Sequence, residues 1–373
     1  MQHDHGEHLK VLLLVGSYQL RGSYSRTQSL AEYLPNRKVS LSLISSEQPR
    51  LPQQILQRVK THTSRYLTWP VVSPLARHVL ACDLRAKPPD LIDIQHRSLH
   101  PLGMWLARRM KCPYIVTIHD YLRDRERFVI DPQWCQRVIA VSDSVREELL
   151  ERTKLPESLV SVISSGVQTP PEQELSCILN TSRAPVIGTA GPLEAGKGLQ
   201  HFLRAAVRIL KSRPDTLFLI AGSGPEERSL RSLAMDLQIS HAVTILPNLH
   251  DFTPALKAMD IFVLPALKQG LGSTMLDAMA WGLPVVASES GGVFSVVVDG
   301  MTGFLVPPSD DVALAERMRF LLENPDRARE LGCNARKRIQ ERFDITHFID
   351  STISLYREVS GPAVTTTLPS SSL

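Results

Sequence analysis

Residues 268–288 read KQGLGSTMLDAMAWGLPVVAS, a glycine-rich loop followed by a helix and a strand. Gly270 and Gly272 let the backbone approach a ligand closely just before the helix, and Ser273 or Thr274 can cap it. Free amides at that helix end, together with a dipole of about half a charge, favour phosphate oxygens. The stretch therefore predicts an anion-binding turn in an α/β sheet.

Two polar side chains flank this helix start. Gln269 and Asp277 lie eight residues apart, and we expect Asp277 in the first turn, where its carboxylate can accept hydrogen bonds from hydroxyl groups. A carboxylate there also suits the helix dipole when no ligand is bound. A ligand site and a purely structural turn are therefore both open on local grounds.

Outward from this stretch, short apolar runs alternate with helical patterns along most of the chain. The expected strands are residues 10–16, 39–45, 90–95, 114–120, 137–143, 161–167, 185–191, 217–224, 243–248, 260–266 and 284–288. Strands that alternate with helices form parallel βαβ units, in which ligands bind beyond the carboxyl ends of the strands. We therefore predict an α/β fold of two doubly wound domains in tandem, with a cleft between them.

The alternation breaks over residues 168–184, where two adjacent prolines and mixed polarity indicate an interdomain connection. We expect an N-terminal domain over residues 1–170, a linker over 171–184, a C-terminal domain over 185–344, a C-terminal helix over 345–360 and a disordered tail over 361–373. The chain is long enough for each domain to bury a core of its own.

Composition indicates an ordinary globular protein. The chain has 373 residues, 43% hydrophobic and 21% charged, with a net charge of +4, so nothing global indicates nucleic-acid binding. The five cysteines are widely spaced and form no CxxC pair, which argues against a zinc site or a disulfide framework. No apolar segment reaches the roughly 18 residues of a membrane span, so we expect a cytoplasmic protein.

Residues 191–198, GPLEAGKG, follow an expected strand and nearly match the phosphate loop in which Gly-Lys precedes Ser or Thr. Gly191, Gly196 and Lys197 fit, but Gly198 has no hydroxyl for magnesium. A glycine turn with one lysine at a helix N-terminus can hold an anion, or it can be a plain turn. No two aspartates are separated by one residue, so a bound diphosphate would rely on Lys197 and backbone amides, and no metal is expected.

Four segments, taken in order, resemble the family 4 glycosyltransferases. They are GPLEAGKG (191–198), AGSGPEERSLRSLA (221–234), QGLGSTMLDAMAWGLPVVAS (269–288) and GGVFSVVVDGMTGFLVPPSD (291–310). The resemblance spans about residues 10–343. It implies the GT-B fold, in which two Rossmann-like domains face each other across a cleft. The C-terminal domain of that fold binds the sugar donor, the N-terminal domain binds the acceptor, and a C-terminal helix crosses back to the N-terminal domain.

The resemblance also implies roles for single residues. Lys197 matches a lysine that contacts the donor diphosphate, His119 matches a strand-end histidine near the sugar, and Asp277 matches an acid that binds ribose hydroxyls. We expect the donor to contact Arg21, Gly22, Gly191, Lys197, Gly222, Leu249, Gln269, Gly270, Leu271, Gly272, Ser273, Thr274 and Asp277. We expect catalysis from His119, Lys197 and Gln269, and acceptor contacts from His96, His119 and Asp120.

Several positions depart from the family pattern. Gln269 stands where a glutamate is usual, and its amide can bind sugar hydroxyls but cannot stabilise positive charge on the sugar ring. Pro192 replaces an arginine that contacts the diphosphate, and we hypothesise that Arg21, which replaces a glycine, offsets this loss. Phe294 and Ser295 replace Pro-Glu, Ser164 and Ser165 replace Pro-Asn, and Asp277 replaces a longer glutamate.

The resemblance implies a retaining, metal-independent hexosyltransferase without a cofactor. It would move a sugar from a nucleotide-diphosphate sugar to a hydroxyl of a saccharide or lipid-linked acceptor, in polysaccharide, lipopolysaccharide or glycolipid biosynthesis. The alternatives are a catalytically silent or attenuated GT-B protein, which binds nucleotide sugar or serves as an assembly subunit, and a sugar-nucleotide 2-epimerase. The sequence does not specify the base, the sugar, the acceptor, the linkage or the oligomeric state.

Residues 50–87 form a basic segment, with seven lysines and arginines and one acid. Leu51, Ile55 and Val59 recur there at helical spacing. This pattern fits weak contact with an anionic surface at the inner face of a membrane, and it also fits a solvated helix face.

Overall fold

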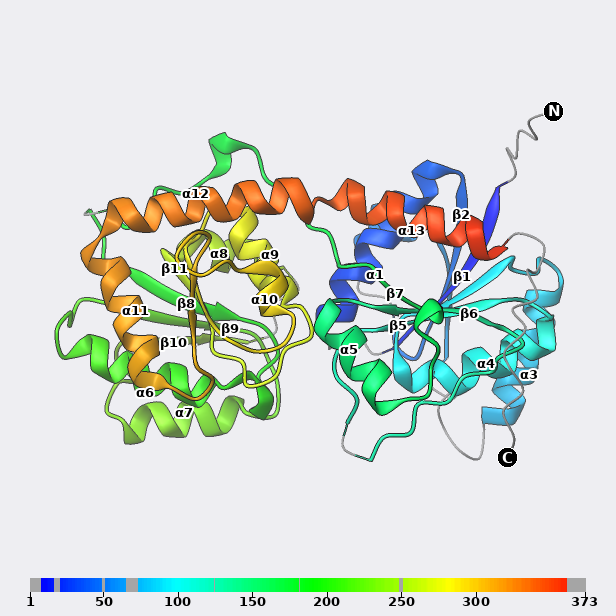
Figure 1. Cartoon of the computed structure of the whole chain (residues 1–373), viewed down its shortest axis with the longest axis horizontal. Helices are drawn as coiled ribbons and strands as arrows, with labels where there is room; N and C mark the ends of the chain where they lie inside the picture. The colour runs from blue at the N-terminus through cyan, green and yellow to red at the C-terminus, as the bar shows by residue number, and fades with distance from the viewer. Residues whose placement is uncertain are drawn as a thin grey trace. The chain divides into compact units, whose positions relative to one another are not determined.

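The computed structural model describes residues 8–16, 21–48, 51–64, 73–123, 125–180, 182–247 and 251–360, with the side chains of residues 21–24 and 73–75 left undescribed. The chain divides into two compact units, each with its own sheet (Figure 1). The first unit comprises Met1–Ser164 and Phe348–Leu373, and the second comprises Ser165–His347. The tail expected over residues 361–373 lies outside the described residues.

The first sheet has seven strands, and every neighbouring pair is parallel. They are β1 (Leu9–Val15), β2 (Val39–Ser45), β3 (Lys60–Thr63), β4 (Leu91–Ile94), β5 (Tyr114–Ile118), β6 (Cys135–Ala140) and β7 (Val160–Val162). The spatial order is β3-β2-β1-β4-β5-β6-β7, so the direction of winding reverses between β1 and β4. Ligands of doubly wound sheets bind at such a reversal.

Helices cover both faces of this sheet. They are α1 (Arg21–Tyr33), α2 (Gln53–Leu56), α3 (Ser73–Arg85), α4 (His100–Met110), α5 (Asp143–Arg152) and α13 (Ile345–Ser360). In Figure 1, α1 and α13 lie on one face, whereas α3 and α4 lie on the other, with α4 against β4 and β5. The last helix among the described residues, α13, therefore belongs to the first unit from Phe348 onward.

A buried carboxylate ties α13 to the first sheet. The Tyr356 hydroxyl donates a hydrogen bond to Asp93 Oδ2 on β4, and Gln95 Nε2 donates to the same oxygen at 2.7 Å. All three side chains are fully buried. Burial raises the pKa of Asp93 to about 6, against the opposing effects of the two hydrogen bonds and of the Arg26 charge.

Arg26 on α1 is a second buried charge in this core. Its Nη1 donates to the carbonyl oxygen of Ile163 at 2.9 Å, and its Cζ lies 4.4 Å from the centroid of the Phe348 ring on α13. Burial lowers the pKa of Arg26 to about 10, so the guanidinium stays charged at neutral pH. Polar as well as apolar contacts therefore hold the C-terminal helix against the first unit.

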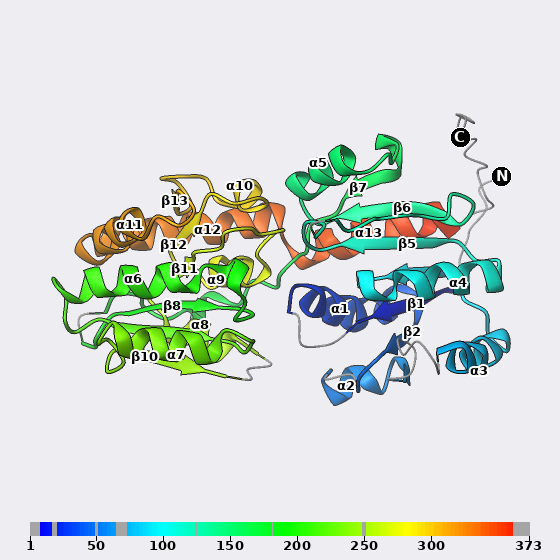
Figure 2. The same cartoon turned by 90° about the horizontal axis from the view of Figure 1, so that it is seen from below.

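The second sheet has six parallel strands in the order β10-β9-β8-β11-β12-β13. They are β8 (Val186–Ala190), β9 (Leu217–Ala221), β10 (Val243–Leu246), β11 (Ile261–Leu264), β12 (Val285–Ser288) and β13 (Phe304–Val306). The helices are α6 (Leu199–Leu210), α7 (Glu227–Asp236), α8 (Thr253–Ala258), α9 (Ser273–Ala280), α10 (Val293–Val296), α11 (Asp311–Glu323) and α12 (Pro325–Arg342). In Figures 1 and 2, α6 and α7 lie on one face, and α8, α9 and α12 lie on the other.

The second sheet has the strand order of a dinucleotide-binding Rossmann fold, with its reversal between β8 and β11. The first sheet has the same order with one strand added at the β7 end. The expected α/β fold of two doubly wound, Rossmann-like domains is therefore confirmed.

The border between the units lies six residues before the expected end of the N-terminal domain at 170. Val167 explains the shift, because its amide donates to the Phe343 carbonyl oxygen at 2.9 Å and it pairs with Asp344 in a β-bridge. Within the expected linker, the Leu179 amide donates to the buried Asp260 Oδ1 at 2.6 Å. The linker is therefore anchored to the second unit.

The apolar residues of the basic segment pack inward. Leu51, Ile55 and Val59 are only 6%, 7% and 4% exposed, so the helix face proposed for membrane contact is part of the core. β3 follows directly, where a strand was not expected, because this sheet-edge strand reads KTHT and lacks apolar alternation. Among the described residues, no helix combines the length and apolar composition that a membrane span requires.

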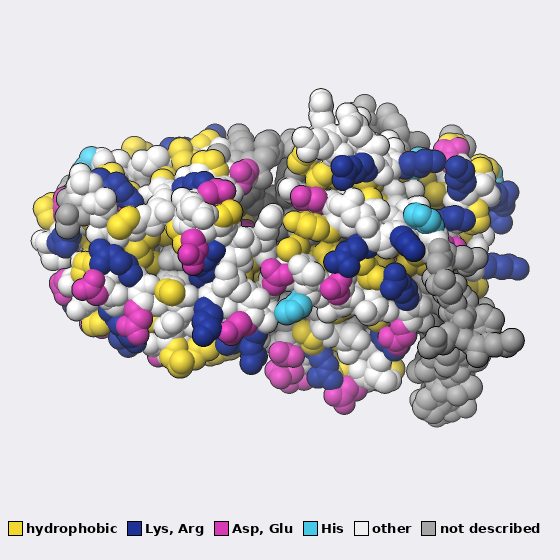
Figure 3. Space-filling view, turned by 90° about the horizontal axis from the view of Figure 1, so that it is seen from above, with side chains coloured by type: hydrophobic (Ala, Val, Ile, Leu, Met, Phe, Trp, Pro, Cys, Tyr) yellow, Lys and Arg dark blue, Asp and Glu magenta, His cyan; other side chains and the backbone are white. Residues whose placement is uncertain are grey.

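The surface shows mixed chemistry. On the face drawn in Figure 3, basic, acidic and apolar side chains are interspersed over both units. This face therefore does not indicate a broad apolar docking area.

Asp93 makes stability depend on pH. Its pKa is about 6 in the folded protein against 3.8 for an ordinary aspartate, so folding favours the protonated form and this contribution is lost as pH rises through 6. We expect wild type to gain on the order of 1 kcal/mol relative to Asp93→Asn between pH 7 and pH 5. Urea denaturation of both proteins at pH 5, 6 and 7 measures this difference, and a constant difference would contradict the assignment.

Candidate functional site

Four loops meet at the carboxyl edge of the second sheet. They follow β8, β9, β11 and β12 and comprise residues 191–198, 222–226, 265–272 and 289–292; we call them the four-loop edge. The loops after β8 and β11 flank the reversal of strand order, where this class of sheet binds its ligands.

Backbone hydrogen bonds join each loop to the next. The amide-to-carbonyl pairs are Leu193 to Ser223, Leu267 to Gly196 and Gly292 to Gln269, each with an N–O distance of 3.0 Å. Because these contacts bind one loop to another, the four-loop edge is a preorganised backbone surface and not a set of independent turns.

Glycines allow these loops to approach one another. A Cβ atom would lie 1.8 Å from the Gly191 oxygen at Gly222, 2.0 Å from the Pro265 oxygen at Gly198 and 1.8 Å from the Gly270 oxygen at Gly292. Gly198 also has a φ of +63°, which an L side chain rarely adopts. The glycine motifs found in the sequence are therefore packing requirements of this edge.

Lys197 and Gln269 meet across the reversal. Lys197 Nζ donates a hydrogen bond to Gln269 Oε1 at 3.0 Å, although the residues lie 72 positions apart in the sequence. With its oxygen on the lysine, the amide group of Gln269 keeps its two N–H donors for another partner. Because Gln269 is neutral, the lysine also keeps its full positive charge.

The helix α9 begins without a side-chain cap. Its N-cap is Gly272, with a φ of +90°, and not Ser273 or Thr274, which lie in the first turn. The amides of Met275 and Leu276 both donate to the Gly272 carbonyl oxygen, at 2.9 and 3.1 Å. Local propensity favoured serine or threonine as the cap, but the left-handed turn takes that position. The first amides of α9 have no acceptor within the helix.

Asp277 lies in the second turn of α9, one turn further along than expected. Residues four apart share a helix face, so Ser273 and Asp277 point the same way. These two are half-buried, while the other α9 residues are buried. Leu271 has a buried side chain, so only its backbone is available at the edge.

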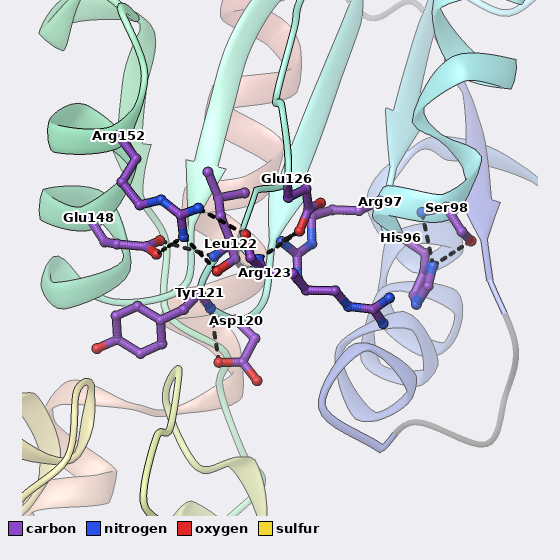
Figure 4. Close-up of polar contacts among 10 residues, drawn as sticks. All are labelled: His96, Arg97, Ser98, Asp120, Tyr121, Leu122, Arg123, Glu126, Glu148 and Arg152. Atoms are coloured by element: carbon purple, nitrogen blue, oxygen red, sulfur yellow. Dashed lines mark hydrogen bonds and ion pairs between the residues drawn. The ribbon is translucent and has the colours of Figure 1, made fainter. Parts of the chain in front are cut away.

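Three predicted site residues, His96, His119 and Asp120, lie in the first unit at the carboxyl ends of β4 and β5, and Figure 4 shows the first and the last of them. His96 Nδ1 accepts a hydrogen bond from the Ser98 amide at 3.3 Å and lies 2.7 Å from Ser98 Oγ. A Cβ atom at Gly16, at the end of β1, would lie 2.4 Å from the His96 ring, so the ring packs on that backbone. Asp120 Oδ1 accepts from the Tyr121 amide at 2.9 Å.

His119 is a half-buried, neutral imidazole. Burial lowers its pKa to about 3, and the charges of Arg26 and Arg97 add to that effect, whereas a hydrogen bond with the Gln95 backbone opposes it. Its Nε2 is buried without a partner among the residues that the structure describes. A buried polar atom without a partner at a strand end indicates a place for a ligand group or a water molecule.

Charged residues hold the loop after β5 in place through hydrogen bonds and ion pairs. The sequence analysis did not predict these residues. Arg152 Nη1 on α5 donates to the Leu122 carbonyl oxygen at 2.7 Å and to Glu148 Oε1 at 2.9 Å. Arg97 Nη1 donates to Glu126 Oε2 at 2.9 Å. Arg97 directly follows His96 at a strand end, so the strand-end rule could have found it. Only the fold brings Glu148 and Arg152 to this loop.

The remaining predicted residues are placed less fully. Arg21 and Gly22 open α1, but their side chains are not described, and Leu249 lies outside the described residues. Ser290 was not predicted, yet its buried Oγ has no partner within the described part of the chain and lies in the last loop of the four-loop edge. The described residues contain no group of three or more His, Cys, Asp or Glu side chains that could hold a metal ion.

Family models match both units. The model for "Glycosyltransferase Family 4" matches residues 21–170, and that for "Glycosyl transferases group 1" matches residues 177–338. α-Maltose-1-phosphate synthase of Mycolicibacterium smegmatis is 31% identical over 70% of this chain and 72% of its own. α-D-Kanosaminyltransferase of Streptomyces kanamyceticus is 25% identical over 89% of this chain and 98% of its own.

Solved structures share the whole fold. Anabaena HepE in complex with UDP and glucose has a TM-score of 0.79 at 19% identity, over 94% of this chain and 100% of its own. A glycosyltransferase from Rickettsia africae has a TM-score of 0.78 at 19% identity, over 96% and 100%. The chain is thus a GT-B protein. It belongs to the family 4 glycosyltransferases and acts in glycan or glycolipid biosynthesis.

Two glycines in one loop test the close packing. Gly198→Ala places a methyl group against the Pro265 carbonyl at a positive φ, so we expect a loss of about 1–3 kcal/mol in stability. Gly196→Ala meets nothing within 4 Å, and we expect a change within about 0.5 kcal/mol. Chemical denaturation compares the two variants, and equal effects would show that the contact between the loops does not constrain the edge.

Proposed function

We propose that this protein transfers a sugar from a nucleoside-diphosphate sugar to an acceptor hydroxyl, with retention of configuration and without a metal ion. The observation that carries the proposal is the contact of Lys197 with Gln269 at the reversal between β8 and β11, beside the uncapped start of α9. A lysine, free helix amides and close-packed glycines are the groups that hold a diphosphate.

In the proposed reaction the bond between the anomeric carbon and the diphosphate oxygen breaks, and the diphosphate leaves with the electron pair. Lys197 and the amides at the start of α9 stabilise the charge that develops on it. The acceptor oxygen bonds to the anomeric carbon on the same face, and its proton passes to the departing phosphate oxygen. Asp277, on the accessible face of α9, accepts hydrogen bonds from the ribose hydroxyls.

The first unit supplies acceptor-side groups in this proposal. His119 stays neutral because its pKa is about 3. If its Nδ1–H donates to the Gln95 carbonyl, Nε2 carries a lone pair and can accept a hydrogen bond from a sugar hydroxyl. His119 thus positions a substrate without exchanging a proton at neutral pH.

The relatives support a nucleotide-sugar donor. HepE, which shares the fold, has been solved with UDP and with UDP-glucose. The related α-D-kanosaminyltransferase and the GDP-mannose-dependent mannosyltransferase of Corynebacterium glutamicum carry sugar-transfer activities in their names. Because those names differ in the sugar, the donors to be tested span several bases and sugars.

A panel of nucleotide sugars and nucleoside diphosphates tests the proposal. A ligand at 100 times its dissociation constant adds about 2.7 kcal/mol to the free energy of unfolding, which thermal denaturation detects. We expect one donor to stabilise the protein and to be hydrolysed slowly, with turnover unchanged by EDTA and retained configuration by NMR. If no nucleotide stabilises the protein, the proposal is wrong. An inverted product or loss of activity with EDTA would refute retention or metal independence, respectively.

A silent GT-B protein is the second candidate, and the neutral Gln269 favours it. A carboxylate in place of this amide would stabilise positive charge on the sugar ring, which the amide cannot do. Donor binding without hydrolysis or transfer, with saccharide and lipid acceptors present, would support this candidate over the transferase.

Gln269→Glu tests the charge balance at the four-loop edge. A carboxylate 3.0 Å from Lys197 Nζ would form an ion pair and reduce the positive charge available to a diphosphate. We expect roughly threefold to tenfold weaker binding of the preferred nucleoside diphosphate, consistent with an ion pair of about 1 kcal/mol. Gln269→Ala removes the amide but leaves the lysine charge, so it is the matched control. Calorimetry measures both, and tighter binding by Gln269→Glu would contradict this account.

A further inference from the structure

The carboxyl edge of the first sheet holds two arginines that the proposed reaction does not use. Arg97 follows β4 and Arg123 follows β5. One oxygen joins their loops: Glu126 Oε2 accepts from Arg97 Nη1 at 2.9 Å and from the Arg123 amide at 2.8 Å. The shared carboxylate therefore holds the Arg97 side chain next to the backbone of Arg123 (Figure 4).

The Arg123 guanidinium has no ion-pair partner in the part of the chain that the structure describes. Its side chain is exposed and extends toward His96 in Figure 4. Of the nearby carboxylates, Glu126 pairs with Arg97, and the others make contacts away from the Arg123 guanidinium. Glu148 pairs with Arg152, and Asp120 accepts from the Tyr121 amide and lies well away from His96 in that view.

His96 adds a donor to the same edge. Because Nδ1 accepts a hydrogen bond from the Ser98 amide, the neutral ring carries its proton on Nε2. Burial lowers the pKa of His96, and the charges of Arg97 and Arg123 lower it further. The two charges that act on this ring are thus positive. The Glu126 carboxylate offsets the charge of Arg97, so the Arg123 guanidinium supplies the uncompensated positive charge beside the ring.

We propose that His96, Arg97 and Arg123 bind a phosphate group on the acceptor, which is therefore a phosphorylated compound with a free hydroxyl. This inference rests on the proposed function. A phosphate offers several acceptor oxygens for the N–H groups of the two guanidiniums and the imidazole, and its negative charge complements the unpaired charge of Arg123. The unpartnered Nε2 of His119 lies at the neighbouring strand end, where it can receive the hydroxyl. The phosphate belongs either to a soluble sugar phosphate or to a lipid headgroup.

Calorimetry with inorganic phosphate and with glucose 1-phosphate tests the subsite on the full chain. Arg123→Gln removes the unpaired guanidinium, and we expect affinity to fall roughly tenfold or more, as for loss of a charge-assisted hydrogen bond. Arg109→Gln removes the same charge from the last turn of α4 and should leave affinity unchanged. Binding that survives Arg123→Gln but is lost in Lys197→Gln would place the phosphate at the four-loop edge and overturn the proposal.

Transfer assays with the preferred donor then separate the sources. Wild type should prefer glucose 1-phosphate over glucose, or vesicles with phosphate-bearing headgroups over neutral vesicles, and Arg123→Gln should reduce that preference. Either preference supports the proposal and names the source. A wild type that binds and hydrolyses donor but shows neither preference overturns the phosphate subsite alone. If the wild type binds no nucleotide, the proposed function is wrong. The calorimetric comparison of phosphate binding by wild type and Arg123→Gln then tests the subsite by itself.

Discussion

The reversal of strand order in each sheet is the constraint on which the other features depend. At the reversal, the connections of two neighbouring strands lead to opposite faces, so the backbone at their carboxyl ends is not covered by a crossing helix. In the second unit this leaves room for Lys197 and Gln269, which come from either side of the reversal. In the first unit, His96 occupies the corresponding place, and its ring packs on Gly16, the residue directly after β1.

The two units treat charge in different ways. The first unit buries Asp93 and Arg26. Tyr356 and Gln95 donate to Asp93 Oδ2, and Arg26 Nη1 donates to the Ile163 carbonyl oxygen. Those charges belong to the packing between the sheet and α13. The second unit leaves Lys197 half-buried beside a neutral amide, which orients the side chain without cancelling its charge. The charged groups of the core are thus held by hydrogen bonds within the packing, whereas the Lys197 charge is oriented by a single neutral amide.

The buried strands could be predicted because a continuous run of apolar residues indicates a strand that is covered on both faces of its sheet. β3 could not, since an exposed edge strand carries no such run. The prediction that Ser273 or Thr274 caps α9 was wrong. Capping preferences consider which side chains can accept a hydrogen bond, whereas here Gly272 adopts a left-handed conformation and takes the N-cap position. Lys197 and Gln269 were found through ordered motifs, but their contact required the fold. The pairing of Asp93 with Tyr356, 263 residues apart, leaves no local trace in the sequence.

The first unit is assembled from both ends of the chain, and this has a consequence for biosynthesis. A ribosome delivers Asp93 first, and Tyr356, which hydrogen-bonds its carboxylate, emerges 263 residues later. The second unit is continuous in sequence and has all of its residues before α13 is complete. Domains usually fold in the order of synthesis. Here the downstream unit can finish first, and the upstream unit has to wait with a core that lacks α13 and the hydroxyl partner of Asp93.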